Sequence, residues 1–339
     1  MKRVFVTGGA GFIGSAFVRM ILNETTDVRV VNFDALTYAG NLENLQGIGG
    51  PNYEFIKGDI CDRDAVLDAL PEDCDALFNF AAESHVDRSI HSADEFLKTN
   101  IIGTQVLLDA ARERKVRRFV QVSTDEVMGT LPEDESAFFT ESSPLQPNSP
   151  YAASKAAAEF VVRAARETFG LDTVITRCGN NYGPRQFPEK LIPLMIANAM
   201  NDDPLPVYGD GKNVRDWIFV DDHCSAIWMA YEKGSPGEVY NIGARNVIPN
   251  IDVVHSLLDA LGKPRSLVKY VTDRLGHDRR YAIDPTKAET ELGWAPKVSW
   301  EEGLRITIDW YRENQAWVNN IRNGEYKNYY KSMYGTALK

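Results

Sequence analysis

Short apolar runs alternate with longer segments of helical periodicity along the first half of the chain. The runs at 4–8, 28–33, 53–58, 76–82, 117–123 and 172–177 are continuously apolar rather than alternating, which predicts strands buried on both faces. Helical patterns at 14–23, 94–114 and 151–169 lie between these strands. This order predicts an α/β fold in which helices cover both faces of a doubly wound parallel sheet.

The pattern changes after residue 179. Segments 183–193 and 202–213 are rich in proline and glycine, whereas 216–232 and 238–243 again indicate strand, helix and strand. We therefore expect two domains, of which the C-terminal one is smaller and discontinuous. The first comprises 1–179 plus about 217–245, and the second about 180–216 plus 246–339.

Composition narrows the class of partners. The 339 residues include 48 acidic and 37 basic side chains, and the formal net charge of −11 disfavours nucleic acid and anionic membranes as partners. No apolar window is long enough to span a membrane, and no signal-peptide pattern precedes the first strand. The four cysteines are scattered without metal-ligand spacing, so we expect a cytoplasmic protein with neither disulfides nor a metal site.

Three glycines follow the first predicted strand. Gly8, Gly11 and Gly14 in TGGAGFIG stand where a strand passes into a helix, which is the context of a dinucleotide-binding turn. Asp34 ends the second strand 20 positions after Gly14, where a carboxylate accepts from a ribose diol and repels a 2′-phosphate. Glycines in an ordinary turn are the alternative, but the combination favours a Rossmann domain that binds NAD rather than NADP. Adenine and ribose contacts are expected from residues after the third and fourth strands, namely Asp59, Ile60, Phe80, Ala81 and Ala82.

Tyr151 and Lys155 in PYAASK are four residues apart, so they share one face of a helix. An ammonium beside a phenol, near a positive nicotinamide ring, stabilises phenolate and is expected to lower the pKa of Tyr151. Such a tyrosine removes a hydroxyl proton while hydride leaves the same carbon. YxxxK alone is common on exposed helices, and only its combination with the glycine motif makes it specific.

The two motifs together resemble the extended short-chain dehydrogenase/reductase family, whose members act mostly on nucleotide sugars. Thr124, Asp125 and Glu126 follow the strand at 117–123, and read without the resemblance they are a helix cap with two acids at its positive end. The sugar 4,6-dehydratases of the family carry Thr-Asp-Glu here, whereas its epimerases carry a serine- or threonine-rich segment. A dehydration needs both a base and an acid, which gives the two carboxyls a function.

This resemblance implies a reaction in three steps. Tyr151 takes the C4 hydroxyl proton while hydride passes to NAD, and Thr124 holds the C4 oxygen. Glu126 then removes the C5 proton as Asp125 protonates the departing C6 hydroxyl. Hydride returns to C6 of the resulting enone while C5 is reprotonated, so NAD is regenerated in each turnover and stays tightly bound.

Several long stretches resemble the dTDP-glucose 4,6-dehydratases in particular, among them LTYAGN, NFAAESHVDRSI, PEKLIP, VYGDGKNVRDWIFVDDHC and GHDRRYAID. The resemblance implies dTDP-glucose as substrate and a second domain that binds the nucleotide sugar. The implied cofactor-binding set, with Tyr151 and Lys155 shared, is Gly8, Gly11, Phe12, Ile13, Gly14, Asp34, Leu36, Thr37, Asp59, Ile60, Phe80, Ala81, Ala82, Ser84, Thr99 and Asn181. The implied substrate-binding set is Ser84, His85, Asn180, Lys190, Leu191, Pro206, Tyr208, Arg215, Asn250, Arg274 and His277.

The sequence departs from the dehydratase pattern at three positions. Met128 replaces a usual tyrosine, Gly179 a usual serine, and Arg185 a usual tyrosine or histidine. We expect Met128 to alter substrate packing or rate. The alternatives are a dehydratase of CDP-, GDP- or UDP-linked hexoses, an epimerase, and a noncatalytic NAD-sensing protein.

The resemblance also implies a homodimer formed through the helices at 94–114 and 151–169. The aromatic-rich segment 323–335 is expected to be a packed or partly ordered C-terminal segment.

Overall fold

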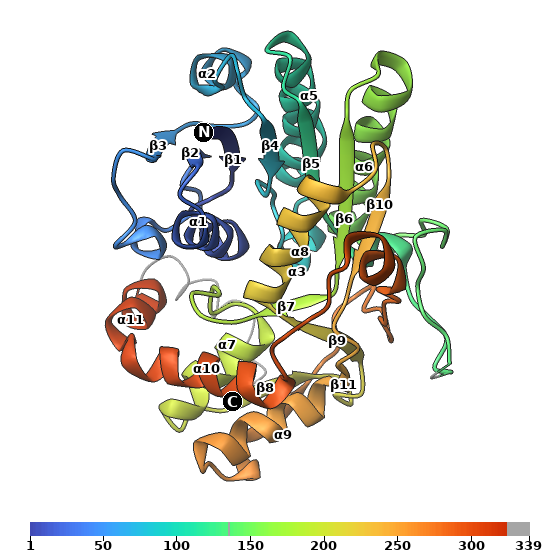
Figure 1. The fold of residues 1–339 in the computed structure, drawn as a ribbon. Coiled ribbons are helices and arrows are strands. Elements are labelled where there is room, and N and C mark those ends of the chain that lie inside the picture. The colour runs from blue at the N-terminus through green and yellow to red at the C-terminus, as the bar shows by residue number, and fades with distance from the viewer. Residues whose placement is uncertain (135, 324–339) are drawn as a thin grey trace.

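The structure, a computed structural model, describes residues 1–134 and 136–323 (Figure 1). Its centre is a seven-stranded sheet with the strand order β10-β6-β5-β4-β1-β2-β3, in which every pairing is parallel. The strands are β1 (Lys2–Thr7), β2 (Val28–Asp34), β3 (Tyr53–Lys57), β4 (Ala76–Asn79), β5 (Arg118–Thr124), β6 (Thr173–Cys178) and β10 (Val239–Ile242). The predicted doubly wound parallel sheet is confirmed.

Helices cover both faces of this sheet. Phe5 packs into the core beneath α2 (Arg63–Ala69), α5 (Thr104–Glu113) and α6 (Pro150–Phe169). Val4 and Val6 on the same strand face α1 (Phe12–Glu24) and α8 (Val220–Lys233) on the other side. Because successive strand residues point to opposite faces and both faces are buried, the strand sequences are continuously apolar.

The region predicted as one helix at 94–114 consists of three consecutive helical segments. These are α4 (Asp94–Leu97), a wider π-type turn η2 (Lys98–Gly103) and α5, and α3 (Val86–His91) precedes them. The wide turn contains Asn100, whose side chain donates to Ser154 Oγ on α6 at 2.8 Å and accepts from the Glu83 backbone at 2.9 Å. The irregular turn therefore carries a polar link between α6 and the segment after β4.

The second half of the chain packs around its own apolar core. A three-stranded sheet, β11-β9-β7, and a two-stranded sheet, β12-β8, lie beneath its helices. The elements are β7 (Asn180–Tyr182), α7 (Leu191–Met200), β8 (Leu205–Tyr208), β9 (Val214–Phe219), β11 (Val247–Pro249), α9 (Asn250–Leu261), β12 (Val268–Val271), α10 (Trp300–Glu313) and α11 (Gln315–Asn323). Short 3₁₀ or π-type turns are η1 (Leu42–Leu45), η3 (Asp125–Met128), η4 (Arg265–Leu267) and η5 (Ala288–Leu292).

The predicted strand-helix-strand at 216–243 corresponds to β9, α8 and β10. β9 pairs with β7 and β11, whereas β10 joins the seven-stranded sheet beside β6. The chain therefore crosses between the two cores within this segment. The exact domain boundaries stay a prediction.

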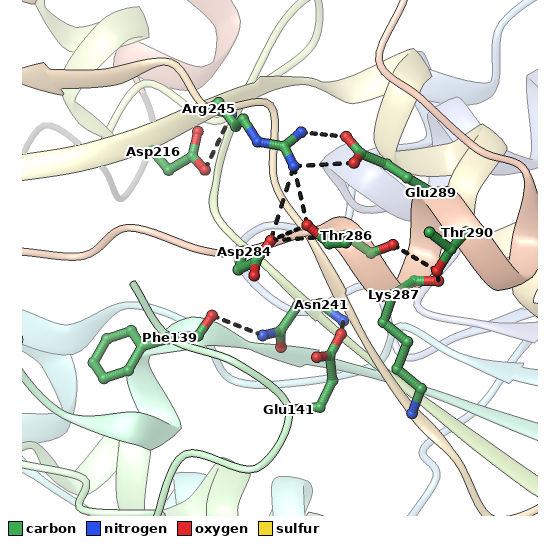
Figure 2. A network of polar contacts seen from close by, with 10 residues as sticks. All are labelled: Phe139, Glu141, Asp216, Asn241, Arg245, Asp284, Thr286, Lys287, Glu289 and Thr290. Atoms are coloured by element: carbon green, nitrogen blue, oxygen red, sulfur yellow. Dashed lines mark hydrogen bonds and ion pairs between the residues drawn. The ribbon is translucent and has the colours of Figure 1, made fainter. Parts of the chain in front are cut away.

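A polar network closes the β10 edge of the large sheet (Figure 2). The backbone N–H of Asn241 donates to Glu141 Oε1 at 2.8 Å, and the Asn241 side chain donates to the Phe139 carbonyl at 3.1 Å. Farther along, Arg245 forms an ion pair with Glu289. The contacts of Asn241 satisfy polar groups of a buried residue at the sheet edge, and the network ties this edge to segments far away in the sequence.

No helix within residues 1–134 and 136–323 combines the length and the apolar character needed to cross a membrane. Residues 324–339 lie outside the described part of the chain, and they include all of the aromatic C-terminal segment 323–335 except its first residue.

Candidate active site

A cleft with a cavity volume of about 350 Å³ lies where the strands of the large sheet end. All five predicted catalytic residues line it. So do all of the predicted cofactor-binding residues except Leu36, which lies beside it. Of the predicted substrate-binding residues, Ser84, Asn180 and Lys190 line this cleft. Parallel strands bring residues from distant parts of the chain together here because their carboxyl ends share one edge.

The glycine turn between β1 and α1 has no room for side chains. Gly8 has a φ of +71°, and a Cβ there would lie 2.6 Å from the backbone nitrogen of Ala81. A Cβ on Gly14 would lie 2.3 Å from the Gly8 carbonyl oxygen. Gly11 begins α1 without a side-chain cap, and the first turn of α1 contains no acid. These residues fit the diphosphate of a dinucleotide, which needs close backbone approach and a helix N-terminus.

Asp34 lies at the end of β2, facing the same turn. Its carboxylate accepts from the backbone N–H of Ala10 at 2.9 Å and of Leu36 at 2.8 Å. Burial raises the pKa of Asp34, and the two backbone donors oppose that shift. The carboxylate is thereby held in place at the cleft wall, where its remaining lone pairs suit a ribose diol.

Tyr151 and Lys155 lie in the first turns of α6. Ser149 caps this helix by accepting from the Ala152 N–H at 3.1 Å, and Pro150 occupies its first position. Lys155 Nζ donates to the Val122 carbonyl at the end of β5, at 2.7 Å. The helix therefore directs both side chains to the ends of the strands.

The expected lowering of the Tyr151 pKa, which includes the effect of a positive nicotinamide ring, stays a prediction, and the groups of the chain by themselves shift this pKa upward. Burial raises the pKa of Tyr151 well above its usual value, and the charges of Glu126 and Asp125 raise it further, opposed by a hydrogen bond with Thr124. Burial also lowers the pKa of Lys155 to about 8. Burial is thus the largest cause of the upward shift of the Tyr151 pKa, and the two nearby carboxyls, which are not part of the tyrosine–lysine motif, add to it.

Asp125 and Glu126 form the first turn of η3. Thr124 Oγ1 accepts from the Glu126 N–H at 3.3 Å, so the residue is a helix cap as well as a cleft residue. Burial and the charge of Glu126 raise the pKa of Asp125 well above its usual value. Burial also raises the pKa of Glu126, but the cations Arg274, Lys190 and Arg215 oppose the shift. Adjacent carboxyls thus differ in how readily they give up a proton.

A second polar cluster joins Asp87 to side chains from the second half of the chain, none of which is among the described residues that line the cleft. Tyr208 donates to Asp87 Oδ2 at 3.1 Å, and Arg274 Nη1 lies 3.6 Å from Asp87 Oδ1. The rings of Tyr208 and His277 meet edge to face with centroids 6.1 Å apart. The guanidinium of Arg215 lies 4.2 Å from the centre of the Tyr281 ring.

The other predicted substrate residues are placed as follows. Lys190 Nζ donates to the Ser84 carbonyl at 2.8 Å, and buried His85 lies 3.8 Å from Glu189. Pro206 lies in β8, which carries Tyr208 at its end. Leu191 begins α7 and packs against the core of the second half, and Asn250 begins α9.

Sequence reasoning missed several cleft residues. Glu189 lines the cleft beside Lys190 and accepts a hydrogen bond from Tyr38 at 3.1 Å. Its place in the PEKLIP stretch was the available signal. Trp317 also lines the cleft and donates to Asn44 at 3.0 Å, a contact across 273 sequence positions that no local pattern indicates.

Comparisons with known proteins identify the family. Residues 5–307 match the family model described as GDP-mannose 4,6 dehydratase. A dTDP-glucose 4,6-dehydratase of Xanthomonas campestris pv. campestris is 52% identical, covering 96% of this chain and 98% of that protein. The chain belongs to the GDP-mannose 4,6-dehydratase family, among its dTDP-glucose 4,6-dehydratases. The resemblance stated from the sequence is confirmed.

Solved structures of this family share the fold. The dTDP-glucose 4,6-dehydratase DesIV of Streptomyces venezuelae, with NAD and TYD bound, has a TM-score of 0.91 and 50% identity, covering 94% of this chain and 99% of that one. A UDP-glucose 4-epimerase of Thermotoga maritima, with UDP-glucose, has a TM-score of 0.85 at 32% identity, covering 92% of this chain and 99% of that one. The fold is thus common to dehydratases and epimerases, and the site residues must distinguish them.

The three departures from the dehydratase pattern have structural settings. A Cβ on Gly179 would lie 2.6 Å from the Asp216 carbonyl oxygen, so this backbone contact leaves no room for serine without a shift. Met128 is buried among Val127, Phe139, Ala156 and Tyr281 and is not among the described residues that line the cleft. Arg185 lines the cleft in a left-handed conformation with φ of 68°.

Proposed function

We propose that this chain converts dTDP-glucose to dTDP-4-keto-6-deoxyglucose and water, as an NAD-dependent hydro-lyase. The observation that carries the proposal is the meeting of Asp125 and Glu126 with Tyr151 and Lys155 in one cleft. An epimerase exchanges hydride at one carbon and leaves the two carboxyls without a function. A dehydratase uses both of them.

The glycine turn and Asp34 would hold the diphosphate and a ribose of NAD, and Lys155 would hold the nicotinamide ribose. NAD, when bound, supplies the site that accepts a hydride from C4 of the sugar and gives it back to C6. Tyr151 takes the proton of the C4 hydroxyl, and Thr124 orients the C4 oxygen. Both side chains line the cleft. Burial and the two carboxyls raise the pKa of Tyr151, and the hydrogen bond with Thr124 together with the positive nicotinamide ring of bound NAD would oppose that shift.

Asp125 and Glu126 divide the loss of water between them. Because its pKa is raised well above the usual value, Asp125 holds a proton that it can deliver to the departing C6 hydroxyl. Glu126 faces Arg274, Lys190 and Arg215, which favour its ionised form, so it serves as the base at C5. The two roles follow from the surroundings of each carboxyl rather than from its type.

The nucleotide is held by the second half of the chain. Lys190, Arg215 and Arg274 supply positive charge for the diphosphate, and Tyr208 offers a ring for the base. His85, Asn180, Leu191, Pro206, Asn250 and His277 complete the proposed substrate set. Arg215 is 4% exposed, so its charge is directed into the protein rather than into solvent.

We further infer that the protein is a cytoplasmic homodimer. All four cysteines are free, which suits a reducing compartment. Leu97, Ile102 and Phe160 are exposed by 45%, 56% and 59% on the α4, η2 and α6 segments, which contact one another. A second copy that covers this apolar face explains why three large hydrophobic side chains gather there.

The test is mass spectrometry of dTDP-glucose incubated with the purified protein in heavy water, with no NAD added. We expect loss of one water and gain of one carbon-bound deuterium, at C5. UDP-glucose under the same conditions is the matched substrate control and should react at least tenfold more slowly. Unchanged dTDP-glucose, after NAD is supplied to folded protein, contradicts the proposal.

The variant Glu126→Gln separates the two halves of the reaction. It should abolish deuterium incorporation and product formation, because no base remains at C5. Absorbance of reduced cofactor at 340 nm should still appear when substrate is added. Normal product formation by this variant would show that Glu126 is not the base.

A further inference from the structure

A buried ion pair lies behind the catalytic lysine, outside the residues that line the cleft. Arg177 on β6 binds Glu159 on α6 through Nε, 3.1 Å from each carboxylate oxygen, and through Nη2, 2.7 Å from Oε2. The side chains are exposed by only 6% and 4%. Ser123 Oγ donates to Glu159 Oε1 at 2.6 Å. The Glu159 carboxylate is therefore fully engaged by charged and neutral donors.

This carboxylate joins three elements directly behind the active site. The β5–β6 pairing places Ser123 opposite Arg177, and the next pair is Thr124 opposite Cys178. Both members of that next pair line the cleft. Glu159 thus fixes α6 to the two strands at the edge of the site, where Ser123 itself lines the cleft.

Glu159 also lies four residues after Lys155, on the same face of α6. Lys155 is 4% exposed, and its ammonium donates to the Val122 carbonyl. Burial lowers the pKa of Lys155 to about 8, and the charge of Glu159 is the largest influence that raises it. The titratable groups around Lys155 are Tyr151 and Glu159 on α6, Asp125 and Glu126 on η3, and Arg177 and Cys178 on β6.

A contribution to stability alone is a weak explanation for the buried ion pair of Arg177 and Glu159. Replacement of a buried ion pair by apolar side chains of similar size is often neutral or stabilising, because burial of two charges is costly. We propose that Glu159 is a positioning residue, which keeps the Lys155 ammonium charged and in place beside Tyr151. Arg177 and Ser123 hold the carboxylate in place through hydrogen bonds.

The other side of Arg177 contacts the segment that closes the sheet edge. Its Nη1 donates to the Glu141 carbonyl at 3.3 Å and lies 3.8 Å from the Met128 sulfur. Glu141 is the residue whose side chain caps the backbone of Asn241 (Figure 2). Met128, a departure from the usual tyrosine, therefore contacts the pair behind the lysine.

The inference rests on the proposed role of Lys155, so its first test does not depend on the reaction. Full-length protein labelled with ¹⁵N-lysine, with its NAD and without substrate, is titrated while the Lys155 Nζ signal is followed by NMR. In Glu159→Gln the midpoint should fall by roughly one pH unit, the lower end of the shifts that nearby opposite charges produce, because the charge of Glu159 is the largest influence that raises the Lys155 pKa. Glu159→Asp and Ser123→Ala, which keep the charge, should titrate close to the wild type.

The second readout is the pH dependence of sugar oxidation, measured as cofactor reduction in a single turnover. The alkaline limb in Glu159→Gln should move to lower pH, with about a fivefold lower rate at pH 8, as a fall of roughly one unit in a midpoint near 8 implies, and recovery toward pH 6. If Glu159→Gln leaves Arg177 unpaired and fails to fold, the double variant Glu159→Gln with Arg177→Gln replaces it and should also show a lower Lys155 midpoint. An unchanged midpoint in the folded variants, or a rate loss that is equal at every pH and is shared by Ser123→Ala, overturns the proposal.

Discussion

Asp125 and Glu126 are neighbours in the chain but meet different surroundings. Glu126 faces three cations that come from residues 190, 215 and 274, whereas the largest charge effect on Asp125 is repulsion by Glu126 itself. We expect these different surroundings to make one carboxyl the acid and the other the base. The sequence motif indicates that both take part, but the division of roles depends on side chains from distant segments.

The buried charge of Lys155 lowers the free energy of unfolding at neutral pH, although the residue lies in the candidate active site. Its pKa falls from 10.5 to about 8 on folding, so below pH 8 the folded state must keep a buried charge. The penalty is fully present below pH 8 and disappears as pH rises from 8 to 10.5. We expect Lys155→Met to abolish sugar oxidation yet raise the free energy of unfolding at pH 7 by about 2 kcal/mol, since the shift corresponds to roughly 3 kcal/mol and a hydrogen bond is lost.

Chemical denaturation at pH 7 and at pH 10 measures this effect. The gain should shrink at pH 10, where wild-type Lys155 is already largely neutral. Lys269→Met, at an exposed position of β12, is the control and should change stability by less than about 0.5 kcal/mol. A destabilised Lys155→Met protein at pH 7 would contradict the expectation.

At the scale of elements, we expect the stability of the first turn of α6 to affect catalysis, because this turn carries Tyr151. Its cap residue Ser149 lies two positions before Tyr151, so a frayed first turn displaces the phenol directly. Ser149→Ala should cost about 1 kcal/mol of stability and lower kcat severalfold. Ser299 caps α10 in the same way, accepting from the Glu302 N–H at 3.2 Å, away from the cleft.

Ser299→Ala is therefore the matched control for this element. It should cost a similar free energy of unfolding with little change in kcat. Thermal unfolding and steady-state kinetics on both variants test the pair, and equal losses of kcat would show that helix capping does not reach the site.

Helix signals in the sequence differed in how well they described the elements. The patterns for α1 and α6 match the observed helices within two residues at each end, because each is one amphipathic helix with clear ends. The segment 94–114 contains a π-type turn that its periodicity does not show. That turn is set by the contacts of Asn100 with Glu83 and Ser154, which come from other elements.

At the scale of the molecule, substitutions in the proposed dimer face test the oligomeric state directly. Ile102→Glu combined with Phe160→Glu places two charges in the apolar face formed with Leu97, so the protein should sediment as a monomer. Tyr270→Glu changes a side chain that is 59% exposed on β12, away from this face, and should leave the mass unchanged. A wild-type protein that is monomeric at micromolar concentration would contradict the dimer.

The amino-acid sequence by itself determined the parallel sheet, the glycine turn and the presence of five candidate catalytic residues. These depend on local periodicity, on backbone space and on short spacings, all of which are properties of contiguous residues. Only the tertiary structure decided the upward shifts of the Asp125, Glu126 and Tyr151 pKa values and the engagement of Glu159 by Arg177 and Ser123. Burial and the summed field of charges decide these properties, and both arise only when strand ends from distant parts of the chain meet.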